Sequence, residues 1–203
     1  MKNVYRISGG PLFSNSYILT ENNSDCIVVD CCDGDKILRF LHDNGLKCRA
    51  VFLTHAHFDH CMNVSELAKE GAEIYMHEAD IPLIHSSDNL AETMGADFKP
   101  FDVDVKVADG DIYSLCSMTV KVIHTPGHTR GGVCYLVDDE IIFSGDTLFR
   151  MSVGRTDFPG GNARELAGSV KEKLFTLQKN YSVYPGHDEA TNIFFERENN
   201  RYV

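Results

Sequence analysis

A short segment of the chain carries four side chains that can bind metal ions. It reads Thr54-His55-Ala56-His57-Phe58-Asp59-His60 and directly follows the predicted strand Ala50–Leu53. Loops at the carboxyl ends of strands often carry binding sites. Side chains two residues apart in an extended segment point the same way. The first two histidines can therefore bind one ion, and the following turn directs the aspartate and the last histidine toward a second position.

Three further segments place a ligand-type residue beside a glycine or at the end of a strand. In two of them, Pro126-Gly127 and Pro185-Gly186 predict a tight turn just before a histidine. In the third, the predicted strand Ile141–Ser144 ends at a glycine and an aspartate. A catalytic metal needs about three protein ligands and an open position, which the first segment alone does not supply. The candidates that complete the set are His128, Asp146 and His187.

The elements that must position these residues are short strands separated by helices. Apolar, β-branched runs predict strands at Tyr17–Thr20, Cys26–Val29, Ala50–Leu53, Glu73–Met76, Val103–Val107, Thr119–His124, Val133–Val137, Ile141–Ser144 and Ser182–Tyr184. Helical periodicity predicts helices at about Asp35–Asp43, Asn63–Gly71 and Asn162–Lys179. The last two begin with an Asn and a Glu three residues later, which predicts a start like a capping box at Asn63 and at Asn162. The polar segment Ile81–Pro100 is expected to hold a short helix and to overhang the site. This order predicts a mixed α/β (α+β) chain, a layered sandwich in which helices cover the sheets, as one domain over residues 1–203.

The net charge, the apolar runs and the cysteines of the chain limit its binding partners and its location in the cell. The 203 residues include 30 acidic and 19 basic side chains, for a net charge of −11. A surface this negative disfavours nucleic acid and anionic membranes as partners. No apolar run is long enough for a signal peptide or a membrane span. Seven cysteines without a C-x-x-C pair favour reduced thiols, so we expect a cytoplasmic protein, and Cys61 is expected to be a small buried residue with no role in catalysis.

The order of these motifs resembles the metallo-β-lactamase-fold superfamily over nearly the whole chain. The resemblance implies a four-layered αββα sandwich and a dinuclear metal site. One metal would be held by His55, His57 and His128, the other by Asp59, His60 and His187, with Asp146 bridging them. Asp30, in the sequence IVVD, would support the metal-binding loop without binding metal itself. Hydrolysis of β-lactams is not expected, because the familiar zinc-dependent lactamases have a cysteine or no bridging carboxylate at the position of Asp146.

Within this superfamily the chain most resembles the short, single-domain relatives of glyoxalase II, the hydroxyacylglutathione hydrolase. The segments that carry this resemblance are His124–Thr129, Phe143–Phe149, Gly154–Gly161 and Tyr184–His187. The resemblance implies hydrolysis of a small thioester of the S-lactoylglutathione type. Full-length enzymes continue into a helical domain that contacts glutathione, whereas this sequence stops 16 residues after His187. The carrier thiol therefore stays open. Arg155 is a candidate contact for a substrate carboxylate, and an ion pair within the protein is the alternative.

The chemistry expected of this ligand set follows from charge. The positive charge of two divalent cations exceeds the negative charge of the Asp59 and Asp146 carboxylates. A water shared by the two ions at such a site loses a proton near neutral pH. We predict that these two aspartates act in catalysis together with a metal-bridging hydroxide, which attacks the thioester carbonyl. A thiolate leaving group, with a thiol pKa of about 8.5, needs no general acid. Imidazole suits zinc, iron, copper and nickel, carboxylate also admits manganese and iron, and no thiolate ligand selects zinc. We predict zinc, with iron and manganese as alternatives.

A second function is compatible with the same ligands. Persulfide dioxygenases share the implied fold and bind one iron through the equivalents of His55, His128 and Asp146, a set of two histidines and one carboxylate. Those enzymes usually continue with a glutamine-rich turn after the phenylalanine that matches Phe158. This chain has Pro159-Gly160-Gly161 there, which favours the hydrolase.

Overall fold

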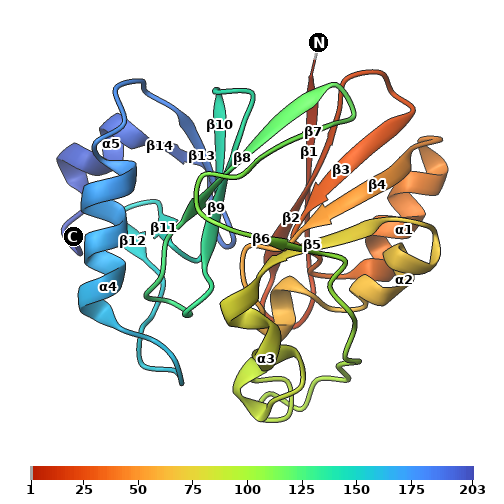
Figure 1. The fold of residues 1–203 in the computed structure, drawn as a ribbon, viewed down its shortest axis with the longest axis horizontal. Coiled ribbons are helices and arrows are strands. Elements are labelled where there is room, and N and C mark those ends of the chain that lie inside the picture. Colours follow the sequence, from red (N-terminus) through yellow and green to blue (C-terminus); the bar gives the residue numbers. More distant parts are fainter. Residues whose placement is uncertain (1) are drawn as a thin grey trace.

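A computed structural model describes residues 2–203, which form two six-stranded sheets and a small hairpin (Figure 1). The first sheet has the order β1-β2-β3-β4-β5-β6. Its strands are β1 (Asn3–Gly9), β2 (Ser14–Thr20), β3 (Asp25–Val29), β4 (Lys47–Phe52), β5 (Glu73–His77) and β6 (Val105–Val107). The second sheet has the order β14-β13-β10-β9-β8-β7. Its strands are β7 (Ile112–Leu115), β8 (Met118–His124), β9 (Val133–Val137), β10 (Ile141–Gly145), β13 (Ser182–Pro185) and β14 (Thr191–Asn192), and the hairpin pairs β11 (Leu148–Phe149) with β12 (Ser152–Val153).

Helices α1 (Gly34–Asp43) and α2 (Val64–Lys69) lie on the outer face of the first sheet, and α4 (Ala163–Gly168) and α5 (Ile193–Asn199) lie on the outer face of the second (Figure 1). Helix α3 (Ile81–Ile84) lies at the lower edge of the sandwich in the view of Figure 1. Single 3₁₀ turns occupy Phe58–His60, Glu78–Asp80 and Ser87–Asn89, and α4 continues as a π-helical segment over Ser169–Leu174. No helix within residues 2–203 combines the length and the apolar character that a bilayer crossing requires.

Three apolar cores separate four layers. In β2, the side chains of Tyr17 and Leu19 pack between the two sheets, whereas Ile18 packs toward α1 with Ile37. Alternate residues of a strand face opposite sides, so a strand covered on both faces is apolar throughout. The third core lies between the second sheet and the helices that follow it, where Val170 is fully buried. The layers are thus helix, sheet, sheet and helix, as expected from the family resemblance.

One edge of this sandwich collects the loops that carry the candidate ligands. In the first sheet, β3, β4 and β5 are parallel, so the loops after their carboxyl ends emerge on the same side. In the second sheet, β10 and β13 are parallel and β8 ends where β9 begins. Two backbone hydrogen bonds join the sheets at this edge, from Val133 N to Thr54 O at 2.9 Å and from Asn15 N to Gly186 O at 2.7 Å. The fold therefore brings loops of both sheets together at one place.

The predicted strands are all present, with boundaries that differ by up to three residues. Strands β1, β7 and β14 were not predicted, because they are short or half-exposed edge strands with few β-branched residues. The two-residue strands of the hairpin, β11 and β12, were not predicted either. Helix α5 was also missed. Among the predicted helices, the third becomes π-helical and ends at Leu174, before the predicted Lys179. The segment Ile81–Pro100 contains the expected short helix, α3.

The expected capping differs between the two Asn positions. Asn162 accepts hydrogen bonds from Arg164 N and Glu165 N, as predicted. Asn63 makes no such bond, and its φ of 55° is left-handed. A capping side chain reaches the first turn from an extended backbone. The prediction of a capping box at Asn63 was therefore wrong.

Candidate metal centre

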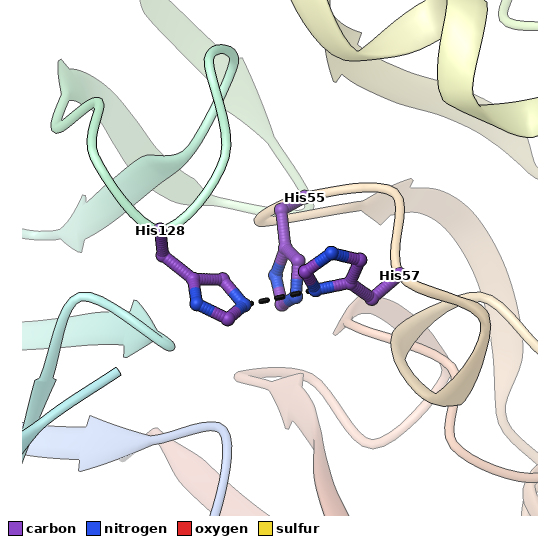
Figure 2. Close-up of side chains that lie close together, drawn as sticks. All are labelled: His55, His57 and His128. Carbon is purple, nitrogen blue, oxygen red and sulfur yellow. Dashed lines mark hydrogen bonds between the residues drawn. The ribbon is translucent and has the colours of Figure 1, made fainter. Parts of the chain in front are cut away.

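Three histidines from two loops point toward one another at the common edge of the sheets (Figure 2). His55 and His57 lie in the loop after β4, and His128 lies in the loop between β8 and β9. Each offers one ring nitrogen, and these nitrogens all lie within 4.8 Å of one another. His57 Nδ1 is 2.9 Å from His128 Nε2. All three side chains are buried. This histidine cluster has the size and the donor atoms of a metal site.

Hydrogen bonds on the far side of two of these rings orient them. His55 Nδ1 lies 3.1 Å from the hydroxyl of Thr54, and His128 Nδ1 lies 2.7 Å from the backbone carbonyl oxygen of Arg155. A ring nitrogen that donates to a carbonyl leaves the other nitrogen with a free electron pair. The Nε2 atom of His128 therefore carries the free electron pair and can bind a metal ion.

A second cluster, formed by Asp59, His60 and His187, adjoins the first. Asp59 Oδ2 lies 3.4 Å from His60 Nε2 and 3.3 Å from His187 Nε2. The other ring nitrogen of His60 lies 2.9 Å from a carboxylate oxygen of Asp30. The carboxylate of Asp30 also accepts hydrogen bonds from the backbone N and the hydroxyl of Thr54. Asp30 thus hydrogen-bonds both the start of the ligand loop and the His60 ring.

The carboxylate of Asp146 lies between the two clusters. Its Oδ2 atom is 3.5 Å from His128 Nε2 and 3.6 Å from His187 Nε2. Its Oδ1 atom is 3.3 Å from His60 Nε2. Asp146 also forms a compact group with His55 and His60. The structure therefore brings all seven candidate ligands together, with the Asp146 carboxylate near histidines of both clusters.

Burial keeps the side chains of His55 and His57 neutral. It lowers the pKa of His55 well below the usual value, and the nearby His60 and His128 lower it further. Burial together with His128 lowers the pKa of His57 to about 3. Neutral imidazole is the form that binds metal ions. At pH 7 both side chains are therefore ready to act as ligands.

The second cluster attracts positive charge. Burial opposes a charge on His60, but the nearby carboxylates of Asp59, Asp146 and Asp30 outweigh it and raise the pKa of His60 to about 10. Burial opposes a charge on His187 as well, but Asp59 and Asp146 raise its pKa. Burial would raise the pKa of Asp59, but His60 and His187 hold it below its usual value. A divalent cation can take the place of the protons on these histidines.

Two further observations show that the residues fit metal ions. Within residues 2–203, the buried side-chain polar atoms without a hydrogen-bond partner are His55 Nε2, His57 Nε2 and Asp146 Oδ1, all in these clusters. Buried polar atoms normally have partners, so three unpaired ones in one place are available to bind a metal ion. The second observation is the glycine at position 186, beside the clusters. A Cβ there would lie 2.6 Å from His60 Cε1 and closer still to Asp146 Oδ1, so only glycine leaves these two side chains their space.

The remaining sequence candidates lie around the clusters. The guanidinium of Arg155 forms a two-pronged ion pair with Asp157 and lies 3.9 Å from the centroid of the Phe158 ring. His124 lies outside both clusters, where Nε2 is 2.9 Å from the carbonyl oxygen of Arg130. The thiol of Cys61 donates a hydrogen bond to the backbone carbonyl oxygen of His57. Burial raises the pKa of this thiol well above the usual value. A thiol held protonated in this way is a poor nucleophile, which agrees with the expectation for Cys61.

Two residues at the centre were missed from the sequence. Ser14, the first residue of β2, donates a hydrogen bond of 2.6 Å to Asp59 Oδ2. Asp80 is fully buried beside the histidine cluster. A local pattern could have found neither. The signal for Ser14 is the pairing of β2 with β3, in which Tyr17 lies opposite Val29, so that Ser14 extends to the edge of the sheet that carries the site.

Comparison with known proteins identifies the family. A family model described as the metallo-beta-lactamase superfamily matches residues 9–187. The chain belongs to the metallo-beta-lactamase superfamily. Relatives of this superfamily member include the uncharacterized protein ML0493 of Mycobacterium leprae, 38% identical over 96% of this chain and 95% of the relative. The probable metallo-hydrolase YqgX of Bacillus subtilis is 32% identical over 98% of this chain and 96% of its own. Hydroxyacylglutathione hydrolase GloC of Haemophilus influenzae is 27% identical, over 93% of this chain and 92% of the GloC chain.

Solved structures show the same fold. The crystal structure of BLEG-1 B3 metallo-beta-lactamase superposes with a TM-score of 0.89 at 29% identity, covering 100% of this chain and 99% of that chain. The crystal structure of TTHA1623 in a di-iron-bound form has a TM-score of 0.88 at 32% identity and covers 98% of this chain and 100% of the TTHA1623 chain. ETHE1 from Myxococcus xanthus has a TM-score of 0.80 at 26% identity, covering 98% and 83%. The chain therefore has the metallo-beta-lactamase fold, and its relatives support a metal-dependent hydrolase with a divalent metal site.

Proposed function

We propose that this protein hydrolyses a small thioester at a dinuclear metal centre. The observation that carries the proposal is the pair of adjoining ligand clusters with Asp146 between them. The relative GloC, named a hydroxyacylglutathione hydrolase, supports a thioester as the substrate class. YqgX, named a probable metallo-hydrolase, supports the more general reaction.

In this proposal each cluster holds one divalent ion. His55, His57 and His128 would hold the first, and Asp59, His60 and His187 would hold the second. Asp146, which lies between the two clusters, would help to hold both. The mixed imidazole and carboxylate donors suit zinc, which we propose as the metal, and they also suit iron and manganese. The di-iron-bound form of TTHA1623 makes iron a specific alternative.

The ions, when bound, would supply a hydroxide nucleophile near neutral pH and an electrophile for the substrate carbonyl. The protein's own side chains prepare the site for this. Asp30 keeps the His60 ring in one orientation, and the carbonyl oxygen of Arg155 does the same for His128. Asp59 and Asp146 add negative charge that retains the cations. A thiolate can leave without a proton donor, which fits a centre whose acidic and basic groups are engaged with one another.

Arg155 is our proposed contact for a carboxylate of the substrate at the rim of the site. Its ion pair with Asp157 is exposed, with side-chain exposures of 57% and 66%. Exposed ion pairs contribute little to stability, so a substrate carboxylate can replace Asp157 at little cost. Next to this pair, the Phe158 ring lies 5.8 Å from the His57 ring, centroid to centroid. A substrate that reaches the metals would pass this apolar surface.

A cytoplasmic location is part of the proposal. It is supported by the cysteines, all seven of which are free thiols in residues 2–203. Reduced thiols are typical of proteins in reducing compartments.

The decisive experiment combines metal analysis with substrate assays on the purified protein. Metal content is measured per chain, and four reactions are followed. These are hydrolysis of S-lactoylglutathione, hydrolysis of a simple acyl thioester, hydrolysis of a chromogenic β-lactam, and oxygen uptake with glutathione persulfide. Two metal ions and thiol release are expected. One iron per chain with oxygen uptake would replace the hydrolase with a persulfide dioxygenase. Efficient β-lactam cleavage without thiol release would assign the activity of BLEG-1's class instead.

A further inference from the structure

Asp80 is a fully buried carboxylate that joins the two loops of the histidine cluster. It ends the 3₁₀ turn Glu78–Asp80, directly after β5. One oxygen, Oδ2, accepts hydrogen bonds from Ala56 N at 3.1 Å and from the Thr129 hydroxyl at 2.8 Å. The other, Oδ1, accepts from Gly131 N at 2.6 Å. Asp80 takes part in no ion pair within residues 2–203.

The three donors belong to the segments that hold the ligands. Ala56 separates His55 from His57 in the loop after β4 of the first sheet. Thr129 directly follows His128, in the loop between β8 and β9 of the second sheet. The carboxylate of Asp80 therefore hydrogen-bonds both the loop after β4 and the loop between β8 and β9, which belong to different sheets. The separation of the three ring nitrogens depends on how these loops sit relative to each other.

The donors require an acceptor without protons of its own. An ionised carboxylate accepts at both oxygens, whereas an asparagine at position 80 would turn its NH₂ group toward either Ala56 N or Gly131 N, each of which already carries a hydrogen. The approach is close on the loop side as well. A Cβ at position 131 would lie 2.6 Å from Asp80 N and 2.7 Å from Asp80 Oδ1, so a residue with a side chain does not fit there. Burial of an unpaired carboxylate is unfavourable, and such a group is retained where its hydrogen bonds are needed.

We propose that Asp80 is a positioning residue that sets the distance between His57 and His128 and thereby the metal affinity of the histidine cluster. The inference rests on the metal centre of the proposed function. It does not depend on the identity of the substrate.

Glu196 offers a matched control. It is also fully buried, and it accepts from Met151 N, from the Thr191 hydroxyl and from the Asn200 side-chain amide. It takes part in no ion pair within the described residues and bonds neither ligand loop. Glu196→Gln therefore disturbs a buried carboxylate with three donors without disturbing the loops that Asp80 joins.

The test measures metal affinity in the full-length protein. Zn²⁺ affinity is obtained by competition with a chromophoric chelator, and the visible absorption of bound Co²⁺ reports ligand geometry. Loss of a residue that orients metal ligands typically weakens metal affinity about 10–100-fold. We expect a loss of this size and a changed Co²⁺ spectrum for Asp80→Asn. For Glu196→Gln we expect a lower melting temperature, a wild-type Co²⁺ spectrum and Zn²⁺ affinity within about twofold of wild type.

A second pair of variants keeps the test valid if Asp80→Asn does not fold. Thr129→Val removes one of the three donors at nearly constant volume, and Thr129→Ser keeps the hydroxyl. Affinity should fall in the first and be retained in the second. Wild-type affinity in Asp80→Asn or in Thr129→Val would overturn the inference while leaving the proposed function intact. Equal losses in Asp80→Asn and Glu196→Gln would assign the effect to general destabilisation and overturn it as well. A wild-type protein that binds no metal would overturn both proposals.

Discussion

Replacing Gly186 by alanine tests the geometry of the proposed dinuclear centre with a single methyl group. The backbone at Gly186 does not have the positive φ that would itself exclude alanine. The added Cβ would lie 2.6 Å from His60 Cε1, well inside the 3.4 Å at which ordinary van der Waals contact begins, and closer still to Asp146 Oδ1. His60 is buried completely and held from behind by Asp30, so it has little room to move away.

The size of the effect follows from the displacement that the methyl group requires. Relieving these contacts moves a ligand by about 1 Å, whereas metal–ligand distances tolerate about 0.2 Å. A misplacement of about 1 Å commonly reduces turnover about 100-fold. We therefore expect Gly186→Ala to lose at least one of two metal ions per chain and to hydrolyse thioester at least about 100-fold more slowly. Overpacking itself destabilises a fold by about 1–3 kcal/mol, so the metal-free variant should still fold.

The assay compares metal content, thioester hydrolysis and thermal unfolding with those of Gly168→Ala. Gly168 ends α4, and a Cβ there meets nothing within 4 Å. Alanine is favoured over glycine in a helix by about 0.5–1 kcal/mol, so this control should be slightly more stable and fully active. If Gly186→Ala retains two metals and turnover within about twofold of wild type, the close approach of the His60 and Asp146 side chains to residue 186 is refuted.

Three other perturbations probe the same centre. Asp146→Ala should abolish thioester hydrolysis and lower the metal content, since the carboxylate faces both clusters; unchanged turnover would rule out a bridging role. Ser14→Ala removes the 2.6 Å hydrogen bond to Asp59 and should weaken metal binding about 10-fold, measured by chelator competition, whereas wild-type affinity would show that the bond is dispensable. The folded-state pKa of His60, about 10, exceeds its usual 6.5. Its stabilising charge is fully present below pH 6.5 and lost as the pH rises toward 10, so the melting temperature of the metal-free protein should fall over that range; a rise would contradict the sign.

Local sequence patterns predicted several features that depend on neighbouring residues, although the spacing of Asn and Glu that marks a helix start failed at Asn63. The spacing of His55, His57 and Asp59 after an apolar strand indicated two metal positions, and the structure brings these residues into two adjoining clusters. Asn162 and its following glutamate indicated a helix start that the structure confirms. Edge strand β1 was missed because its side chains are largely exposed or half-exposed and its apolar pattern is weak. Helix α5 was missed because it spans only seven residues, follows β14 immediately and has no long apolar stripe.

The sequence by itself determined the types of candidate ligand and their order, which depend on residue chemistry. Local hydrophobic periodicity indicated a layered α/β sandwich, and the αββα arrangement followed from the family resemblance. Only the tertiary structure decided which groups support the ligands. Ser14 reaches Asp59 through the register of β2 against β3, and Asp80 reaches the histidine cluster from the end of β5. The pairing of Arg155 with Asp157 was likewise visible only in the structure. The contacts of Ser14 and Asp80 join residues far apart in the chain. Strand register and the packing of one sheet on the other set them, and neither leaves a pattern in a short stretch of sequence.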